Sequence, residues 1–172
     1  MFKLKTVKPE EATGKVAEAY SVFPAGIPVP APLILMSASP DLLQPQSQVI
    51  RHYMTHSKLD MGLLAVIRYL AASEYNYEFC IKMNTGILKM AGGFSDSELE
   101  DLKRNPENAQ MEDSQKALLL FVLKVIKTPE EIKEADVGKL REMGWSDQDI
   151  FDASFHGTSM IGMSKLYKAF GK

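Results

Sequence analysis

Apolar residues recur at helical spacing in most segments of this chain. The clearest stripe lies within residues 60–74 and comprises Leu63, Leu64, Ile67, Leu70 and Ala71. Residues 113–127 are apolar almost all round, which is typical of a central helix that neighbouring helices bury. No segment alternates convincingly between apolar and polar residues at the period of a strand. The pattern therefore predicts an all-α fold.

Capping residues, glycines and prolines predict where the other helices begin and end. These helices are expected over residues 9–22, 39–57, 77–92, 95–102, 136–143 and 146–170. Four prolines between residues 24 and 32 remove backbone donors and restrain their predecessors, so we expect an extended strap that ends at Leu33. We predict a single domain over residues 1–172, in which an N-terminal helix and the strap (1–38) precede a helical core (39–172).

Composition narrows the classes of function. The 172 residues include 20 Lys and Arg against 22 Asp and Glu, and a net charge of -2 gives no general attraction for nucleic acid. No apolar run approaches the roughly 20 residues of a membrane span, and the N-terminus lacks the apolar region of a secretory signal. We therefore expect a cytoplasmic protein with no membrane or nucleic-acid partner. Its single cysteine excludes a disulfide within the chain.

That cysteine, Cys80, lies in the most informative segment, residues 72–92. Tyr77, Cys80, Asn84 and Leu88 recur at three-to-four spacing, so they share one helical face. We expect Cys80 in the first or second turn, where the helix dipole favours a thiolate. The alternative is structural, because free cysteine is among the most buried residue types and then acts as a small apolar side chain.

Several segments together resemble the alkylhydroperoxidase D and carboxymuconolactone decarboxylase family. They read KLDMGLLAVIRYLAA, FCIKMN, GGFSDSELEDL, EDSQKALLLFVLKV and DVGKLREMGWSDQDIFDA. The resemblance covers roughly Pro32 to Gly171. It implies an all-helical protein of the alkylhydroperoxidase D-like type that assembles as a homo-oligomer, with a possible antioxidant peroxidase (peroxiredoxin) activity.

The redox branch of that family carries Cys-x-x-Cys-x-x-x-His on one helix and a glutamate on the preceding helix. Position by position, the peroxide-attacking second cysteine falls on Cys80, the first on Tyr77, the histidine on Asn84 and the glutamate on Ala65. Only the second cysteine is retained. The resemblance therefore implies at best a single-thiol cycle, in which an external thiol reduces the sulfenic acid formed at Cys80.

Two further residues are candidates for this site. Arg68, on the preceding helix, can point inward to stabilise a thiolate or bind an anionic substrate, or it can extend to the surface. His156, among small and apolar residues of the last helix, can replace the missing base or act as a satisfied core histidine. His52 and His56 have i, i+4 spacing but no convincing third ligand, so we expect no metal and no cofactor.

Two alternative functions remain open. The family's lactone decarboxylase branch does not use the cysteine pair, and an enzyme of that kind would use Arg68 and His156 on an anionic organic acid. A ligand-binding or structural oligomer without catalysis is the other. For the peroxidase hypothesis, the catalytic set is Cys80 as nucleophile, Tyr77 and Asn84 as positioning groups, and Arg68 or His156 as the residue that adjusts charge.

Overall fold

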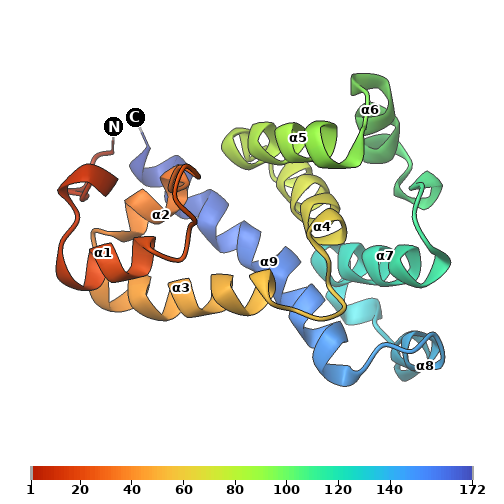
Figure 1. The fold of residues 1–172 in the computed structure, drawn as a ribbon. Coiled ribbons are helices and arrows are strands. Elements are labelled where there is room, and N and C mark those ends of the chain that lie inside the picture. Colours follow the sequence, from red (N-terminus) through yellow and green to blue (C-terminus); the bar gives the residue numbers. More distant parts are fainter. Residues whose placement is uncertain (1, 172) are drawn as a thin grey trace. The chain divides into compact units, whose positions relative to one another are not determined.

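The computed structural model describes residues 2–171 and contains two compact units. The first runs to residue 57 and includes the residues from 165 onward, and the second spans residues 58–164. All secondary-structure elements of the described residues are helices (Figure 1). An isolated antiparallel bridge joins Phe2 to Gly171. The predicted all-α fold is confirmed.

The first unit contains the N-terminal helices. Its elements are η1 (Pro9–Glu11), α1 (Gly14–Tyr20), α2 (Ala31–Met36) and α3 (Pro40–Met54). Helices α1 and α3 pack against each other. Their shared core contains Val16, Ala19, Tyr20, Leu33 and Leu43. The Tyr20 hydroxyl donates to the Val7 carbonyl over 2.8 Å, so the segment before η1 is fixed to this core.

The extended strap is shorter than predicted, because α2 begins at Ala31 instead of leaving the chain extended to Leu33. Pro32 occupies the first turn of α2. A proline is tolerated there, since the first backbone N–H groups of a helix have no intrahelical acceptor. From the sequence, we expected Pro32 to keep the chain extended. A proline is equally compatible with the first turn of a helix, and that is where Pro32 lies.

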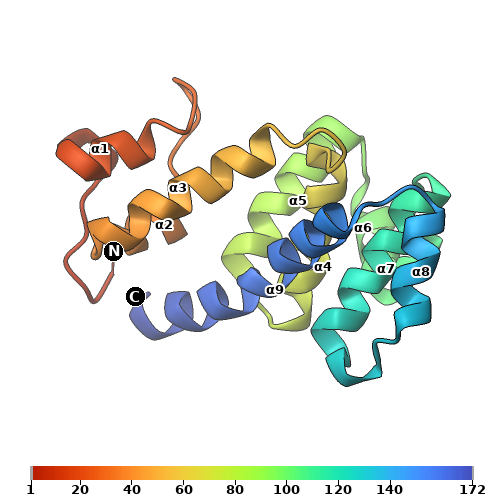
Figure 2. The ribbon, with the colours of Figure 1, turned by 90° about the horizontal axis from the view of Figure 1, so that it is seen from below.

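The second unit contains the helices between residues 58 and 164. Its elements are α4 (Met61–Glu74), α5 (Glu78–Gly92), α6 (Asp96–Arg104), η2 (Pro106–Asn108), α7 (Asp113–Lys127), η3 (Pro129–Glu131), α8 (Glu134–Glu142) and α9 (Asp147–Phe170), of which residues through 164 belong to this unit. Helix α4 lies between α5 and α7 (Figures 1 and 2). Because α4 is covered on both sides, Leu64, Ala65 and Ile67 are fully buried.

Local capping places these helices where the sequence predicts them. The Asp60 carboxylate accepts the Leu63 N–H over 2.8 Å at the start of α4. Asn76 adopts a left-handed φ of 50° and separates α4 from α5, and Gly93, with φ 69°, ends α5. A capping box between Ser95 and Glu98 begins α6, which was expected from residue 95. The boundaries of α5 therefore follow from backbone preferences on either side of it.

Helix α9 approaches α4 and α7 closely at Gly157. A Cβ at this position would lie 2.7 Å from Val122 Cγ1 and 3.3 Å from Ile67 Cγ2. No side chain fits there without displacing its neighbours. Gly157 therefore allows α9 to bring the adjacent His156 against α4.

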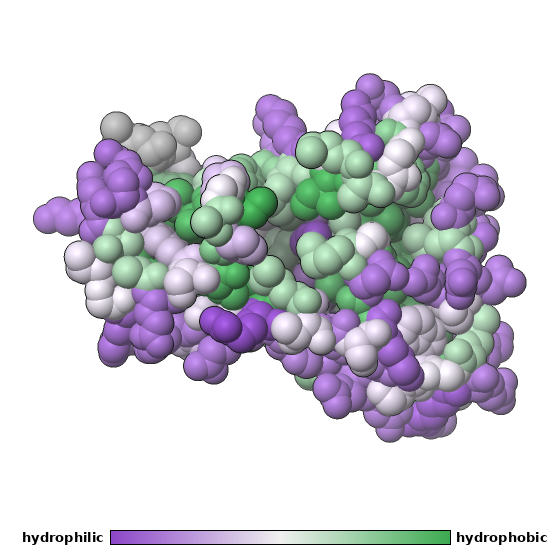
Figure 3. Space-filling model, viewed as in Figure 1, coloured by the Kyte–Doolittle hydropathy of each residue, from purple (hydrophilic) through white to green (hydrophobic). Residues whose placement is uncertain are grey.

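Hydrophilic residues predominate over α6 and α8 on the face that Figure 3 shows. None of the helices in the described part of the chain combines the length and apolar character needed to cross a membrane.

Candidate functional site

The site is organised by the start of α5. Tyr77 is the N-cap residue, and Cys80 is the third residue of the helix. We predicted Cys80 in the first or second turn, and it lies in the first. Both side chains are buried, with 2% of Tyr77 and 3% of Cys80 exposed, and Asn84 one turn later is fully buried. The thiol therefore lies inside the second unit and not on its surface.

Asn84 connects the thiol to α4. Its amide nitrogen donates to the Cys80 carbonyl over 2.8 Å and to Cys80 Sγ over 3.3 Å. Its amide oxygen accepts from Arg68 Nε over 2.8 Å. Because a guanidinium has donors and no acceptor, this contact fixes which end of the amide faces the thiol. Asn84 thus holds Cys80 and Arg68 together.

His156 contacts the other side of the guanidinium. Arg68 Nη1 lies 3.0 Å from His156 Nε2, and this nitrogen must accept because the arginine can only donate. The ring proton is then on Nδ1, and a hydrogen bond with the Leu64 backbone favours the charged ring only weakly. Burial, followed by repulsion from Arg68, lowers the pKa of His156 to about 3. His156 is therefore neutral at physiological pH.

Among residues 2–171, no carboxylate pairs with the positive charge of Arg68. Within the described residues its side-chain partners are the neutral groups of Asn84 and His156. Burial lowers its pKa to about 10, and the opposing influence comes from Cys80. The arginine nevertheless remains charged at neutral pH.

Burial raises the pKa of the Cys80 thiol, while Arg68 and the hydrogen bond from Asn84 act in the opposite direction. The resting sulfur is consequently a protonated thiol. Its thiolate, once formed, would be a negative charge that stabilises the Arg68 guanidinium. The arrangement can stabilise negative charge at this sulfur or on a small molecule beside it.

Met160 also belongs to this site, and the sequence analysis missed it. Cys80 Sγ lies 3.6 Å from Met160 Sδ. Met160 is half-buried and follows His156 by four residues on α9, so the two side chains share a helical face. That spacing was the signal available in the sequence. It was hidden because α9 is rich in small and apolar residues and lacks a clear polar face.

The structure thus brings Cys80, Asn84, Arg68 and His156 into one chain of contacts. Tyr77 lies at the start of the same helix, with its ring centroid 6.4 Å from that of Phe79. Ala65 lies three residues before Arg68 on α4, one turn away on the same side. The position expected to carry a glutamate is therefore apolar, and the charged residue near it has the opposite sign.

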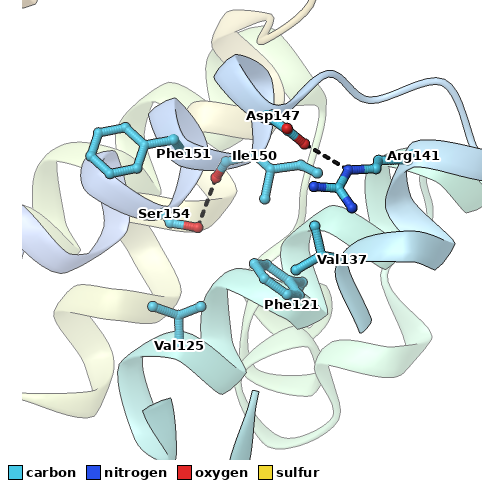
Figure 4. Close-up of a pocket in the computed structure, with 8 residues that line it drawn as sticks. All are labelled: Phe121, Val125, Val137, Arg141, Asp147, Ile150, Phe151 and Ser154. Carbon is cyan, nitrogen blue, oxygen red and sulfur yellow. Dashed lines mark hydrogen bonds and ion pairs between the residues drawn. The ribbon is translucent and has the colours of Figure 1, made fainter. Parts of the chain in front are cut away.

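A separate groove lies between α7, α8 and the first turns of α9 (Figure 4). Its volume is about 290 Å³, and it is lined by Phe121, Val125, Val137, Arg141, Asp147, Ile150, Phe151 and Ser154. None of the five residues predicted for the site lines this groove. Arg141, at one end, donates to Asp147 and Glu134, each over 2.7 Å.

His52 and His56 lie one turn apart on α3, with ring centroids 5.4 Å apart in an edge-to-face arrangement. Two imidazoles supply half of a tetrahedral zinc site. They belong to the first unit, whereas Cys80 and its contacts belong to the second.

No protein-family model and no curated protein sequence matches the chain. Solved structures do match. A protein from Ralstonia eutropha JMP134, described as an alkylhydroperoxidase AhpD core and an uncharacterized peroxidase-related protein, has a TM-score of 0.78 and 20% identity, covering 99% of this chain and 90% of its own. An uncharacterized peroxidase-related protein from Silicibacter sp. TM1040 has a TM-score of 0.75 and 20% identity, covering 98% and 92% respectively. The expected alkylhydroperoxidase D-like fold is confirmed.

Proposed function

We propose that this chain, which has the fold of alkylhydroperoxidase core proteins, is a thiol-dependent hydroperoxide reductase with one working cysteine, Cys80. It acts on a small hydroperoxide, takes its electrons from an external thiol, and requires no metal or cofactor. The proposal includes a cytoplasmic homo-oligomer. Light scattering tests the assembly, since a monomer at micromolar concentration would contradict it.

The observation that carries the proposal is the uncompensated charge of Arg68. A guanidinium taken out of water is unfavourable unless an anion accompanies it. Its two polar side-chain partners are neutral, and Cys80 is the group whose negative charge would stabilise it. The charge of Arg68 is therefore stabilised most when Cys80 is a thiolate. The thiolate is also the form of cysteine that attacks a peroxide.

The reaction then follows from the neighbours of the sulfur. Cys80 loses its proton to solvent as the substrate enters, and Arg68 and Asn84 stabilise the thiolate. The thiolate attacks the terminal oxygen of the hydroperoxide, the O–O bond breaks, and the alcohol leaves after taking up a proton. Cys80 becomes a sulfenic acid, which one external thiol converts to a mixed disulfide and water and a second thiol reduces to Cys80 and a free disulfide.

His156 serves as a positioning residue in this mechanism. A ring whose pKa is about 3 and whose Nε2 accepts from Arg68 is a poor general base at neutral pH. It holds the guanidinium in place without adding a competing positive charge. This differs from the sequence hypothesis in which His156 replaced the missing base.

Stopped-flow reaction of the reduced protein with tert-butyl hydroperoxide and with hydrogen peroxide tests the proposal. The Cys80 thiol should be consumed at least ten times faster than free cysteine at the same pH, and dimedone should trap a sulfenic acid at Cys80. Cys80→Ser is the matched control and should show neither effect. Consumption no faster than that of free cysteine removes the proposal.

A second candidate is a cofactor-free, lactone decarboxylase-like enzyme that acts on an anionic organic acid. The same unpaired guanidinium favours it, because Arg68 can bind a carboxylate with its remaining N–H groups. In that case Cys80→Ser retains activity and Arg68→Met loses it. For a non-catalytic oligomer, which the buried thiol favours, both variants leave every assayed activity absent and Cys80 does not react with thiol reagents.

A further inference from the structure

The two sulfur atoms of Cys80 and Met160 are in contact. Their separation of 3.6 Å leaves no room for another group between them. The chain has one cysteine, so no second thiol can form an intramolecular disulfide with an oxidised Cys80. Met160 is thus the sulfur nucleophile already beside the atom that the proposed function oxidises.

We propose that Met160 resolves oxidised Cys80 when no external thiol is present, and that the oxygen equivalent is stored as methionine sulfoxide. The inference rests on the proposed function, because it begins from the sulfenic acid of Cys80. It assigns Met160 as a modification site and gives the chain one turnover without an external reductant.

The steps balance without a further oxidant. The hydroperoxide converts the Cys80 thiol to the sulfenic acid and leaves as an alcohol. The Met160 thioether attacks the sulfenic sulfur, the S–O bond breaks, hydroxide leaves, and a sulfonium joins the two sulfurs. Water adds to the Met160 sulfur and the S–S bond breaks, which releases the Cys80 thiolate. The hydroxide and the thiolate take up the two protons from that water, so Cys80 is reduced by two electrons and Met160 is oxidised by two.

The environment favours this path at one methionine among ten. Met160 is half-buried and held beside Cys80 by α9, whereas Met90, on α5, is 91% exposed. Direct oxidation by a peroxide follows exposure and therefore selects Met90. Oxidation through Cys80 instead depends on the distance to its sulfur atom, so it selects Met160. Sulfoxide reductases can later restore the thioether.

The experiment treats the full-length reduced protein with one equivalent of hydrogen peroxide, without thiol, in water enriched in oxygen-18, and locates the oxygen by peptide mass spectrometry. Met160 should be oxidised at least ten times more than Met90, and its oxygen should come from the solvent. In Cys80→Ser, oxidation of Met160 should fall at least tenfold while that of Met90 stays unchanged. In Met160→Leu, dimedone should trap a longer-lived sulfenic acid.

The outcomes separate the two proposals. If dimedone labels Cys80 in the wild-type protein while Met160 stays unoxidised, the resolving role is wrong and the peroxidase function stands. Oxidation of Met160 that persists in Cys80→Ser, or that carries oxygen from the peroxide, also overturns the role. If Cys80 itself is not oxidised, the proposed function and this inference fail together.

Discussion

Two arginines of the second unit, Arg141 and Arg68, carry the same positive charge in opposite environments. Arg141 lies on the surface beside the groove and donates to Asp147 (Figure 4). It also donates to a second carboxylate, that of Glu134. These hydrogen bonds raise its pKa. Arg68 is withdrawn from solvent, contacts the neutral side chains of Asn84 and His156, and has its pKa lowered to about 10.

The difference shows which of the two positive charges is available to stabilise a ligand or a thiolate. The charge of Arg141 is already balanced, so it contributes to holding α8 against α9 and has little left for a ligand. The charge of Arg68 is not balanced, and the group that can balance it is the only thiol of the chain. Arg141 lines an open groove, whereas Arg68 lies beside a buried thiol.

The largest expected effect comes from removing the unbalanced charge. Arg68→Met keeps much of the side-chain volume but deletes the charge that favours the Cys80 thiolate. A nearby opposite charge shifts a pKa by about 1–3 units, so the thiolate fraction and the rate with hydroperoxide should fall roughly 10- to 1000-fold. Rapid-mixing kinetics at pH 7.5 measure this. Arg141→Met, the matched control, should react like the wild-type protein, and equal losses in both variants would erase the contrast between the two arginines.

The next effect is a pH dependence of stability. His156 has a pKa of about 3 when folded against a usual value of 6.5, so only the unfolded chain takes up this proton between those values. Stability should therefore fall as the pH decreases through this window, by about 1.4 kcal/mol per pH unit from this group. Urea unfolding from pH 7 to pH 4 measures it.

The matched variant is His156→Gln, whose amide oxygen can still accept from Arg68 but does not titrate. The difference in unfolding free energy between the wild-type protein and this variant should shrink as the pH falls. A difference that stays constant over pH 7 to 4 would show that His156 is not held neutral by burial beside Arg68.

The fold could be predicted from the sequence because its signals are local. The Asp60 cap, the Ser95 capping box and the glycines after α5 each act within one helical turn. The failure at Pro32 is local as well, since a proline is compatible both with an extended chain and with the first turn of a helix. Periodicity then determined which faces are buried, which is why α4 and α7 were predicted correctly.

The site was only partly predictable, because its contacts join helices that are distant in sequence. Cys80 and Asn84 share a face by spacing alone, but nothing in the sequence orients Arg68 toward Asn84 instead of toward solvent. The contact between Cys80 and Met160 spans 80 residues and depends on how closely α9 approaches at Gly157. The sign of the Cys80 pKa shift was also beyond the sequence, because it depends on how burial compares with two local attractions.

A smaller effect tests the close approach of α9 to α4 and α7 at Gly157. Gly157→Ala places a Cβ 2.7 Å from Val122 Cγ1, which should destabilise by about 1–3 kcal/mol before the better helix propensity of alanine offsets up to about 1 kcal/mol. Gly162→Ala, in the same helix with no atom within 4 Å of its Cβ, should instead stabilise by up to about 1 kcal/mol. Thermal unfolding compares them. If Gly157→Ala stabilises the protein as Gly162→Ala is expected to, then α9 is not closely packed at Gly157.

The smallest effect on stability is expected at Arg141. A small loss would support the view that its charge is exposed to solvent and already balanced. Arg141→Gln removes both ion pairs at the groove, but these groups are solvated in the folded and unfolded chain, so the urea midpoint should fall only slightly at low ionic strength. The shift should vanish in 0.5 M sodium chloride, because salt screens exposed charges. If the loss is large and survives salt, then Arg141 is not the solvated, balanced charge inferred from its two carboxylates. Its contrast with Arg68 would in that case reflect packing rather than charge.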